Sequence, residues 1–476
     1  MTEHLSRGRI QAQTRDPTVG PTPISALRRT WRTALLVAVL VGAGAAHAQN
    51  EGAQVNGIIP YAYDVTTLDN GLKVIVMPMP SDGLVAYWSI VRTGSRDEYE
   101  PGRSGFAHFF EHMMFRGTER YPAERYQRIM TQIGADANAF TSDDLTAYYV
   151  SMTASDLEQV MELESDRFQN LSYTEGVFQT EAGAVYGEYR KNRTDPLFTL
   201  YEKLMETAFT THTYGHTTLG LEADIAAMPT LYDYSREFFA RYYRPENTVL
   251  LVVGDAQPAN VLELARRYYG GWQRGYVAPP IPEEPAQEEA RRVDVRYDGQ
   301  SLPILWSAYK LGAFDPHDRV RVAADLLAAL AFGETSDAYR RLVLEEQAVE
   351  FLAAEANLNR DPGLFDIYAR VKDPSKVGYV REVLDATVAT YRDAPPDAAR
   401  LTDLQSRLRY GFLMSLQTPE AVARRLARPI AISGGLEGIE ALYAGYAAVT
   451  PADVHAAAQR YLTAERRTVG MLEAGR

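Results

Sequence analysis

The 476-residue chain contains no cysteine. This absence excludes a disulfide framework and a thiolate metal ligand, so a metal site would have to use histidine and carboxylate side chains. Histidine is itself scarce, with eight residues in the chain. Basic residues are fewer than acidic ones, 49 against 62, and the net charge is −13. This acidic balance argues against nucleic acid or an anionic membrane as a partner.

The first 48 residues differ from the rest in composition. Six arginines are opposed there only by Glu3 and Asp16, and an apolar run of 13 residues, 34–46, follows them. That run is too short to span a bilayer, and it ends at Ala-His-Ala48. The pattern is typical of a secretory signal peptide cleaved after Ala48, which predicts export to the periplasm and a mature net charge of about −17.

The sequence His108-Phe-Phe-Glu111-His112 carries the clearest chemical signal. On a helix, His108 and His112 share one face and Glu111 projects over the same turn. Two neutral imidazoles can bind one Zn²⁺, and the carboxylate can take a proton from a water molecule activated by the metal. A chance coincidence on an amphipathic helix has a probability on the order of one per cent. The motif therefore predicts a zinc hydrolase with Glu111 as its base.

A third ligand is expected in the segment 181–192, which holds two glutamates seven residues apart, hence on one helical face. Glu188 lies 76 residues beyond His112. This spacing and the surrounding sequence closely resemble the insulinase, pitrilysin and mitochondrial processing peptidase family of inverzincins. The resemblance implies that Glu188 is the third zinc ligand and that Glu181 orients a ligating histidine. The alternative for Glu181 is an ordinary solvated helix residue.

Segment 134–149 resembles the edge strand on which this family binds substrate. We therefore expect Asn138, Ala139, Phe140 and Thr141 to align an extended peptide through backbone pairing. A second histidine pair, His212 and His216, lies in a glycine- and threonine-rich segment, where four-residue spacing does not imply a shared face, so a structural loop is predicted. The adjacent Asp143 and Asp144 are interpreted as a strand-end turn or a polar contact near the site.

The body of the chain is expected to form an α+β fold of two homologous α/β-sandwich domains. Each would have a largely antiparallel sheet with helices on one face, and together they would form half of a clamshell chamber. The predicted boundaries are 55–275 for the zinc-binding domain, 276–292 for a linker rich in proline and glutamate, and 293–476 for the second domain. Strands are predicted at 62–68, 72–77, 85–91 and 249–253, the first two joined by an Asp-Asn-Gly turn.

The second domain repeats the first in degraded form. Tyr87-Trp88-Ser89 recurs as Leu305-Trp306-Ser307, and the zinc motif falls on residues that cannot bind zinc as a set: Asp325, Ala328 and Ala329 stand for His108, Glu111 and His112. In the family, such a domain can supply an Arg and a Tyr to the substrate. Val343 and Glu350 stand at these positions here, although a one-residue shift would bring Arg341 nearer.

The resemblance therefore implies a zinc metalloendopeptidase that cleaves small or unfolded peptides in a chamber closed by another subunit. A heterodimer with a related chain that supplies the Arg and Tyr is predicted, with a homodimer as the alternative. A non-catalytic assembly or substrate-holding subunit is the second class of function. The retention of His108, Glu111, His112 and Glu188 together favours the enzyme.

Overall fold

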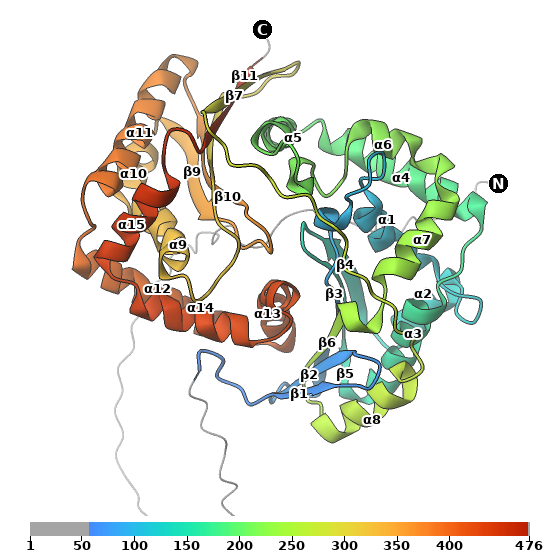
Figure 1. Cartoon of the computed structure of the whole chain (residues 1–476). Coiled ribbons are helices and arrows are strands. Elements are labelled where there is room, and N and C mark those ends of the chain that lie inside the picture. Colours follow the sequence, from blue (N-terminus) through green and yellow to red (C-terminus); the bar gives the residue numbers. More distant parts are fainter. Residues whose placement is uncertain (1–56, 475–476) are drawn as a thin grey trace, which may run out of the picture. The chain divides into compact units, whose positions relative to one another are not determined.

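The computed structural model describes residues 57–474, and the predicted signal peptide lies outside them. Two mixed sheets with flanking helices make up this part of the chain (Figure 1). The first sheet has the order β1-β2-β6-β3-β5-β4, in which β2 and β6 are parallel and the other neighbours antiparallel. Its strands are β1 Asp64–Thr67, β2 Lys73–Pro78, β3 Leu84–Val91, β4 Asp136–Thr141, β5 Thr146–Thr153 and β6 Thr248–Gly254.

The second sheet repeats this arrangement in the order β7-β11-β8-β10-β9, with β7 and β11 parallel. Its strands are β7 Arg291–Tyr297, β8 Ile304–Lys310, β9 Val349–Ala356, β10 Leu364–Val371 and β11 Arg467–Ala474. The order matches β2-β6-β3-β5-β4 strand for strand, and Trp306 on β8 occupies the place of Trp88 on β3. The predicted α+β fold of two related sandwiches is confirmed.

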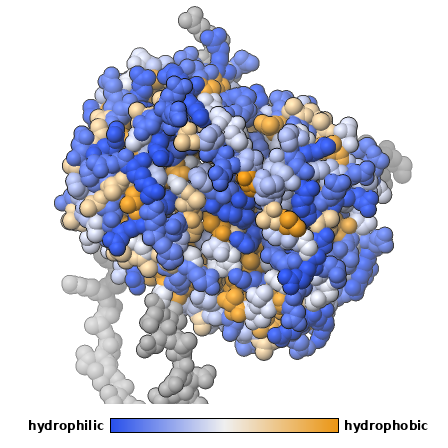
Figure 2. Space-filling model, in the orientation of Figure 1, coloured by the Kyte–Doolittle hydropathy of each residue, from blue (hydrophilic) through white to orange (hydrophobic). Residues whose placement is uncertain are grey.

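Fifteen α-helices accompany the sheets within residues 57–474. Those of the first half are α1 Phe106–Met113, α2 Ala123–Gln132, α3 Leu157–Asn170, α4 Glu175–Asn192, α5 Pro196–Ala208, α6 Glu222–Ala227, α7 Tyr232–Tyr242 and α8 Pro258–Tyr269. Those of the second half are α9 Arg319–Phe332, α10 Asp337–Tyr339, α11 Val377–Asp393, α12 Ala398–Ser415, α13 Pro419–Ser433, α14 Glu437–Ala448 and α15 Pro451–Tyr461. None of these helices combines the length and the apolar character that crossing a bilayer requires. On the face shown in Figure 2, hydrophobic residues are scattered among hydrophilic ones.

The first hairpin follows from its turn residues. Gly71 adopts a φ of 90°, which favours glycine, and the side chain of Asn70 accepts a hydrogen bond from the Leu72 N–H at 3.2 Å. The Asn70 amide also donates to the Tyr269 carbonyl oxygen at 2.7 Å. The turn predicted from sequence therefore also fixes the end of α8 beside the sheet.

Both faces of each sheet are covered, by helices from different halves of the chain. Strand β3 alternates between a core shared with first-half helices, through Tyr87, and a core shared with α13, through Trp88. Helix α5 of the first half covers the second sheet in the same way. Within each half, helices cover one face of the sheet, as predicted. A helix of the other half covers the second face. Leu426 of α13 is fully buried there, so its truncation to alanine should cost ~2–5 kcal/mol.

The segment expected to be one edge strand is a hairpin. Strand β4 lies at the end of the sheet and pairs with β5 alone among the described strands, whereas β5 lies inside the sheet between β4 and β3. Residues 142–145 form the connection, because Ser and two Asp are turn formers. The free strand edge therefore belongs to β4.

The connection between the halves has no helix or strand over residues 270–290, and β7 begins at Arg291, inside the predicted linker 276–292. Glu284 anchors this segment, because its carboxylate accepts hydrogen bonds from the backbone N–H groups of residues 210–212 at 2.9–3.0 Å. Its Oε1 also lies 3.2 Å from Lys310 Nζ. Burial alone would raise the pKa of Glu284, but these hydrogen bonds and the lysine charge lower it to about 2.

Candidate metal centre

Helix α1 carries the zinc motif and begins at an unusual point. Gly105 precedes it with a φ of 91°, and a Cβ at this position would lie 2.8 Å from the Leu219 carbonyl oxygen. The buried carboxylate of Glu98 accepts hydrogen bonds from the backbone N–H groups of Gly105 and Ala107 at 2.7 and 2.6 Å. It satisfies donors that the first turn of a helix leaves unpaired. Glu98 thereby fixes the start of α1.

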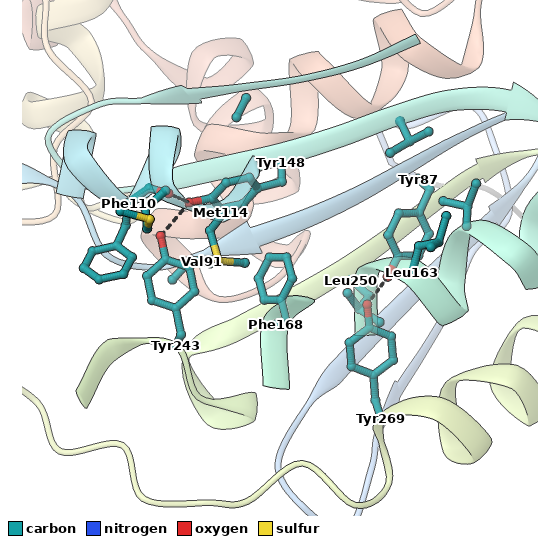
Figure 3. Close-up of a cluster of buried hydrophobic side chains, with 14 of the residues drawn as sticks. Tyr87, Val91, Phe110, Met114, Tyr148, Leu163, Phe168, Tyr243, Leu250 and Tyr269 are labelled. Carbon is teal, nitrogen blue, oxygen red and sulfur yellow. Dashed lines mark hydrogen bonds between the residues drawn. The ribbon is translucent and has the colours of Figure 1, made fainter. Parts of the chain in front are cut away.

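The buried face of α1 is aromatic. Phe106, Phe109 and Phe110 are fully buried in the core of the first half. The Tyr148 hydroxyl on β5 donates to the Phe110 carbonyl oxygen at 3.0 Å and shares a 2.6 Å hydrogen bond with the Tyr243 hydroxyl (Figure 3). The polar face of α1 is therefore held in one orientation.

His108, His112 and Glu188 meet between α1 and α4. Glu188 Oε2 lies 3.8 Å from His108 Nε2 and 3.4 Å from His112 Nε2. One potential ligand atom from each residue lies within 4.8 Å of the other two. Residues 57–474 contain no other group of three or more His, Cys, Asp or Glu arranged in this way.

The imidazole of His108 lacks partners in a place where polar atoms normally have them. The residue is 1% exposed, and both of its ring nitrogens are buried without a hydrogen bond, as is Nε2 of His112. Leaving such a group unsatisfied costs ~1–3 kcal/mol. Burial and the neighbouring His112 lower the pKa of His108 to about 4, so its ring is neutral at pH 7. Two imidazole nitrogens and one carboxylate are the ligand set of catalytic zinc sites, and the cluster fits a zinc ion.

Glu181 lies one layer behind this cluster. Its Oε1 is 2.9 Å from His112 Nδ1, and its other oxygen accepts a hydrogen bond from Arg116. Burial alone would raise the pKa of Glu181, but the hydrogen bond with His112 and the charge of Arg116 outweigh it and lower the pKa. Because His112 Nδ1 is engaged, Nε2 is the nitrogen that faces Glu188. The geometry is that of a carboxylate orienting a metal ligand.

His112 lies between the carboxylates of Glu181 and Glu188. Burial alone would lower the pKa of His112, but the hydrogen bond to Glu181 and the nearby Glu188 carboxylate raise it to about 10. Because a metal-binding imidazole must be neutral, a metal at Nε2 would compete with protonation of His112.

Glu111 faces β4 rather than joining the three-residue cluster. It is 7% exposed, and its Oε2 accepts a 2.7 Å hydrogen bond from the Thr141 hydroxyl. Burial raises the pKa of Glu111, and the Thr141 hydrogen bond opposes this shift. A carboxylate with a raised pKa is suited to accept and return a proton near neutral pH.

The four predicted substrate-binding residues divide between two faces of β4. Ala139 packs into the core that contains α1, and Thr141 contacts Glu111 on the same side. Phe140 packs instead against Trp88, with ring centroids 6.1 Å apart, and Asn138 shares its face by strand alternation. The Asn138 side chain accepts a hydrogen bond from the Ala139 N–H at 2.9 Å. A hydrogen bond joins Thr141 to Glu111 of the motif.

The second histidine pair flanks a short turn. His212 Nε2 is 3.0 Å from Asp361 Oδ2, and its Nδ1 accepts from the Tyr214 N–H at 3.0 Å, whereas His216 Nδ1 contacts the Thr217 carbonyl oxygen. Asp143 and Asp144 lie in the β4–β5 turn.

The equivalent position in the second half contains an ion pair. Asp325 of α9 accepts hydrogen bonds from Arg321 Nη1 at 3.0 Å and from the Tyr446 hydroxyl at 2.8 Å. Of the positions considered for an Arg and a Tyr, Val343 packs partly against the second core, while Glu350 lies 3.4 Å from Arg370. Arg341 Nε forms an ion pair with Glu346 Oε1 at 2.9 Å.

Sequence reasoning did not find Glu98, Arg116 or Tyr148. Arg116 had a local signal, because it lies four residues after His112 and so on the same side of the motif. Glu98 and Tyr148 act through backbone groups of α1, and no side-chain motif marks such contacts.

Two family models match the chain. One, described as insulinase (peptidase family M16), covers residues 73–222, and the other, described as the M16 inactive domain, covers residues 231–408. The zinc protease PqqE of Helicobacter pylori is 29% identical over 368 residues, which are 76% of this chain and 82% of that protein.

Solved structures agree on the fold. A protease from Helicobacter pylori superposes with a TM-score of 0.81 at 26% identity, over 87% of this chain and 99% of that one. The periplasmic protease PqqL of Escherichia coli superposes with a TM-score of 0.72 at 21% identity, over 87% of this chain but 48% of PqqL. This chain thus matches about half the length of PqqL.

Proposed function

The chain belongs to the insulinase (M16) family of peptidases, and we propose that it is a zinc-dependent endopeptidase that hydrolyses peptides or unfolded polypeptide segments. The observation that carries this proposal is the cluster of the buried His108 with the partly buried His112 and Glu188, in which imidazole nitrogens lack hydrogen-bond partners. These three residues would hold the ion. The name of the Helicobacter relative, a zinc protease, supports the same metal.

The chemistry divides between the ion and the chain's own groups. Bound zinc supplies Lewis-acid polarisation of the scissile carbonyl and lowers the pKa of a bound water to roughly 7. Glu111 takes the water proton on its carboxylate and later delivers it to the leaving amine. Thr141 holds one Glu111 oxygen through the 2.7 Å hydrogen bond, which keeps the carboxylate directed toward the site.

The free edge of β4 would bind the substrate backbone. Its outer side pairs with no other strand in residues 57–474, so an extended peptide can add to the sheet beside Thr141 and the metal cluster. Backbone pairing reads the shape of the peptide more than its sequence. Asn138, Ala139 and Phe140 would line this edge.

We further propose that another subunit completes the enzyme. Val343 and Glu350 cannot replace an Arg and a Tyr, and Arg341 is held by Glu346 on an exposed helix. A related chain that supplies these groups would make a heterodimer; a homodimer is the alternative. The predicted signal peptide would place the complex in the periplasm.

The test is hydrolysis of a quenched peptide library by the purified mature chain, alone and with a co-expressed related subunit. Activity that is lost with a chelator and restored by zinc is expected, and it should require or rise strongly with the second subunit. Full activity of the chain as a monomer would refute the proposal that a second subunit completes the enzyme. Absence of both zinc and cleavage under all conditions would favour a non-catalytic subunit.

A further inference from the structure

The turn between β4 and β5 is hydrogen-bonded to residues from both halves of the chain. On the first-half side, the backbone N–H of Arg96 donates to the Asp143 carbonyl oxygen at 2.9 Å, and the N–H of Ser95 donates to that of Ser142 at 3.3 Å. Gly94 approaches so closely that a Cβ there would lie 2.1 Å from the Ser142 carbonyl oxygen. The backbone of residues 94–96 therefore packs directly against the turn.

On the other side lies the equivalent turn of the second half, between β9 and β10. The Arg360 N–H donates to Asp144 Oδ2 at 3.1 Å, and Arg360 Nη2 donates to the carbonyl oxygens of Asp144, Arg92 and Ala431 at 3.1–3.3 Å. Asn359 Nδ2 lies 3.4 Å from Asp143 Oδ2. Two hairpin turns that the internal repeat makes equivalent thus contact each other directly.

The next residue extends the contact. Asp361 Oδ2 accepts hydrogen bonds from Arg96 Nε at 2.6 Å and from His212 Nε2 at 3.0 Å. The Tyr214 hydroxyl donates to Asp144 Oδ1 at 2.8 Å. Arg96 therefore holds the β4–β5 turn with its backbone while its side chain is held by the second half.

The β9–β10 turn is fixed within its own half. The Phe314 N–H donates to the Asn359 carbonyl oxygen at 2.9 Å, and Arg428 Nε donates to the Leu358 carbonyl oxygen at 2.9 Å. The β9–β10 turn can therefore restrain β4. Without these two hydrogen bonds it would be free to move together with β4.

This contact lies close to the proposed base. Thr141, the last residue of β4, is separated by Ser142 from Asp143, and its hydroxyl donates to Glu111. Displacement of the turn would move Thr141 and the free edge of β4 together. We infer that Asn359, Arg360 and Asp361 are positioning residues, through which the half without a metal site holds Thr141 against Glu111.

This inference rests on the proposed function, and a double-mutant cycle tests it. Arg360→Met removes the Nη2 group that donates to three carbonyl oxygens while retaining an unbranched apolar side chain, and it is combined with Thr141→Val. Arg460→Met is the control for loss of a second-half arginine, because the exposed Arg460 binds Asp318 Oδ2 at 2.7 Å and, in the described part of the chain, has no hydrogen bond to the β4–β5 turn. Asp361→Asn, an isosteric change at a partly exposed site, serves if Arg360→Met does not fold.

Arg360→Met is expected to lower kcat roughly tenfold at unchanged zinc content, because small displacements of a reacting group are costly. In the Thr141→Val background its effect should fall below about twofold. Arg460→Met should match the wild type. Multiplicative effects of the two substitutions, or wild-type kcat for Arg360→Met, would overturn the inference.

Amide hydrogen exchange separates this inference from the proposed function. Residues 136–145 should exchange faster in Arg360→Met than in wild type or Arg460→Met, whether or not the chain hydrolyses peptides. Faster exchange, with a wild type that stays inactive even when the related subunit is present, would refute the peptidase and retain the contact. Unchanged exchange would refute the positioning role.

Discussion

Substitution of Glu181 by glutamine should weaken zinc binding without removing a ligand. In the wild type, the Glu181 carboxylate lies 2.9 Å from His112 Nδ1, and its other oxygen is bound to Arg116. Glutamine keeps the shape but loses the charge that favours the Nδ1–H form. Loss of a carboxylate behind a ligating histidine typically costs 10–100-fold in metal affinity. This corresponds to about 1.4–2.7 kcal/mol.

The assay is competition for zinc between the protein and a chromogenic chelator at pH 7. Glu175→Gln is the control, because Glu175 is an exposed residue at the start of the same helix, and its affinity for zinc should equal that of the wild type. Glu188→Gln removes a ligand and should bind zinc more weakly than Glu181→Gln. An unchanged zinc affinity for Glu181→Gln would refute the orienting role.

Three further results are expected. Thr141→Val should lower kcat roughly tenfold at constant zinc content, because Glu111 loses its 2.7 Å hydrogen bond, and an unaltered kcat would contradict this. The Glu284 carboxyl has a pKa of about 2 in the fold against an ordinary 4.5, so its contribution is present above pH 4.5 and is lost as pH falls toward 2. Glu284→Gln should therefore flatten this part of the stability curve and cost ~1 kcal/mol at pH 7 in urea unfolding; identical curves would exclude the contribution. Arg321→Met should destabilise the chain by ~3–5 kcal/mol, because Asp325, whose side chain is mostly covered, loses its counter-charge, whereas the double substitution with Asp325→Leu should cost less; equal losses would argue against the ion pair.

Local signals predicted much of the fold. The Asp-Asn-Gly turn depends on neighbouring residues, and the strands predicted at 62–68, 72–77, 85–91 and 249–253 correspond to β1, β2, β3 and β6. The single edge strand expected in segment 134–149 is instead the β4–β5 hairpin, and Asp143 and Asp144, interpreted as a strand-end turn or a polar contact, lie in its turn. Which helix covers the second face of each sheet depends on packing between residues far apart in sequence, so α13 and α5 could not be placed.

The candidate site divides in the same way. His108, Glu111, His112, Glu181 and Glu188 have fixed spacings within two helices. The structure brings His108, His112 and Glu188 together, with Glu181 bound to His112 and Glu111 bound to Thr141. The contacts of Glu98 with the start of α1 and of Arg360 with the β4–β5 turn join backbone groups to distant side chains. Such contacts have no spacing in sequence, and only the fold reveals them.

The central claim is that Glu111 performs proton transfer at a zinc site formed by His108, His112 and Glu188. The most direct test compares zinc-loaded wild type with zinc-loaded Glu111→Gln on the same quenched peptides, each with the related subunit present. The account predicts about one zinc per chain in both proteins, hydrolysis by the wild type and no measurable hydrolysis by the variant. Equal hydrolysis by both proteins would contradict it.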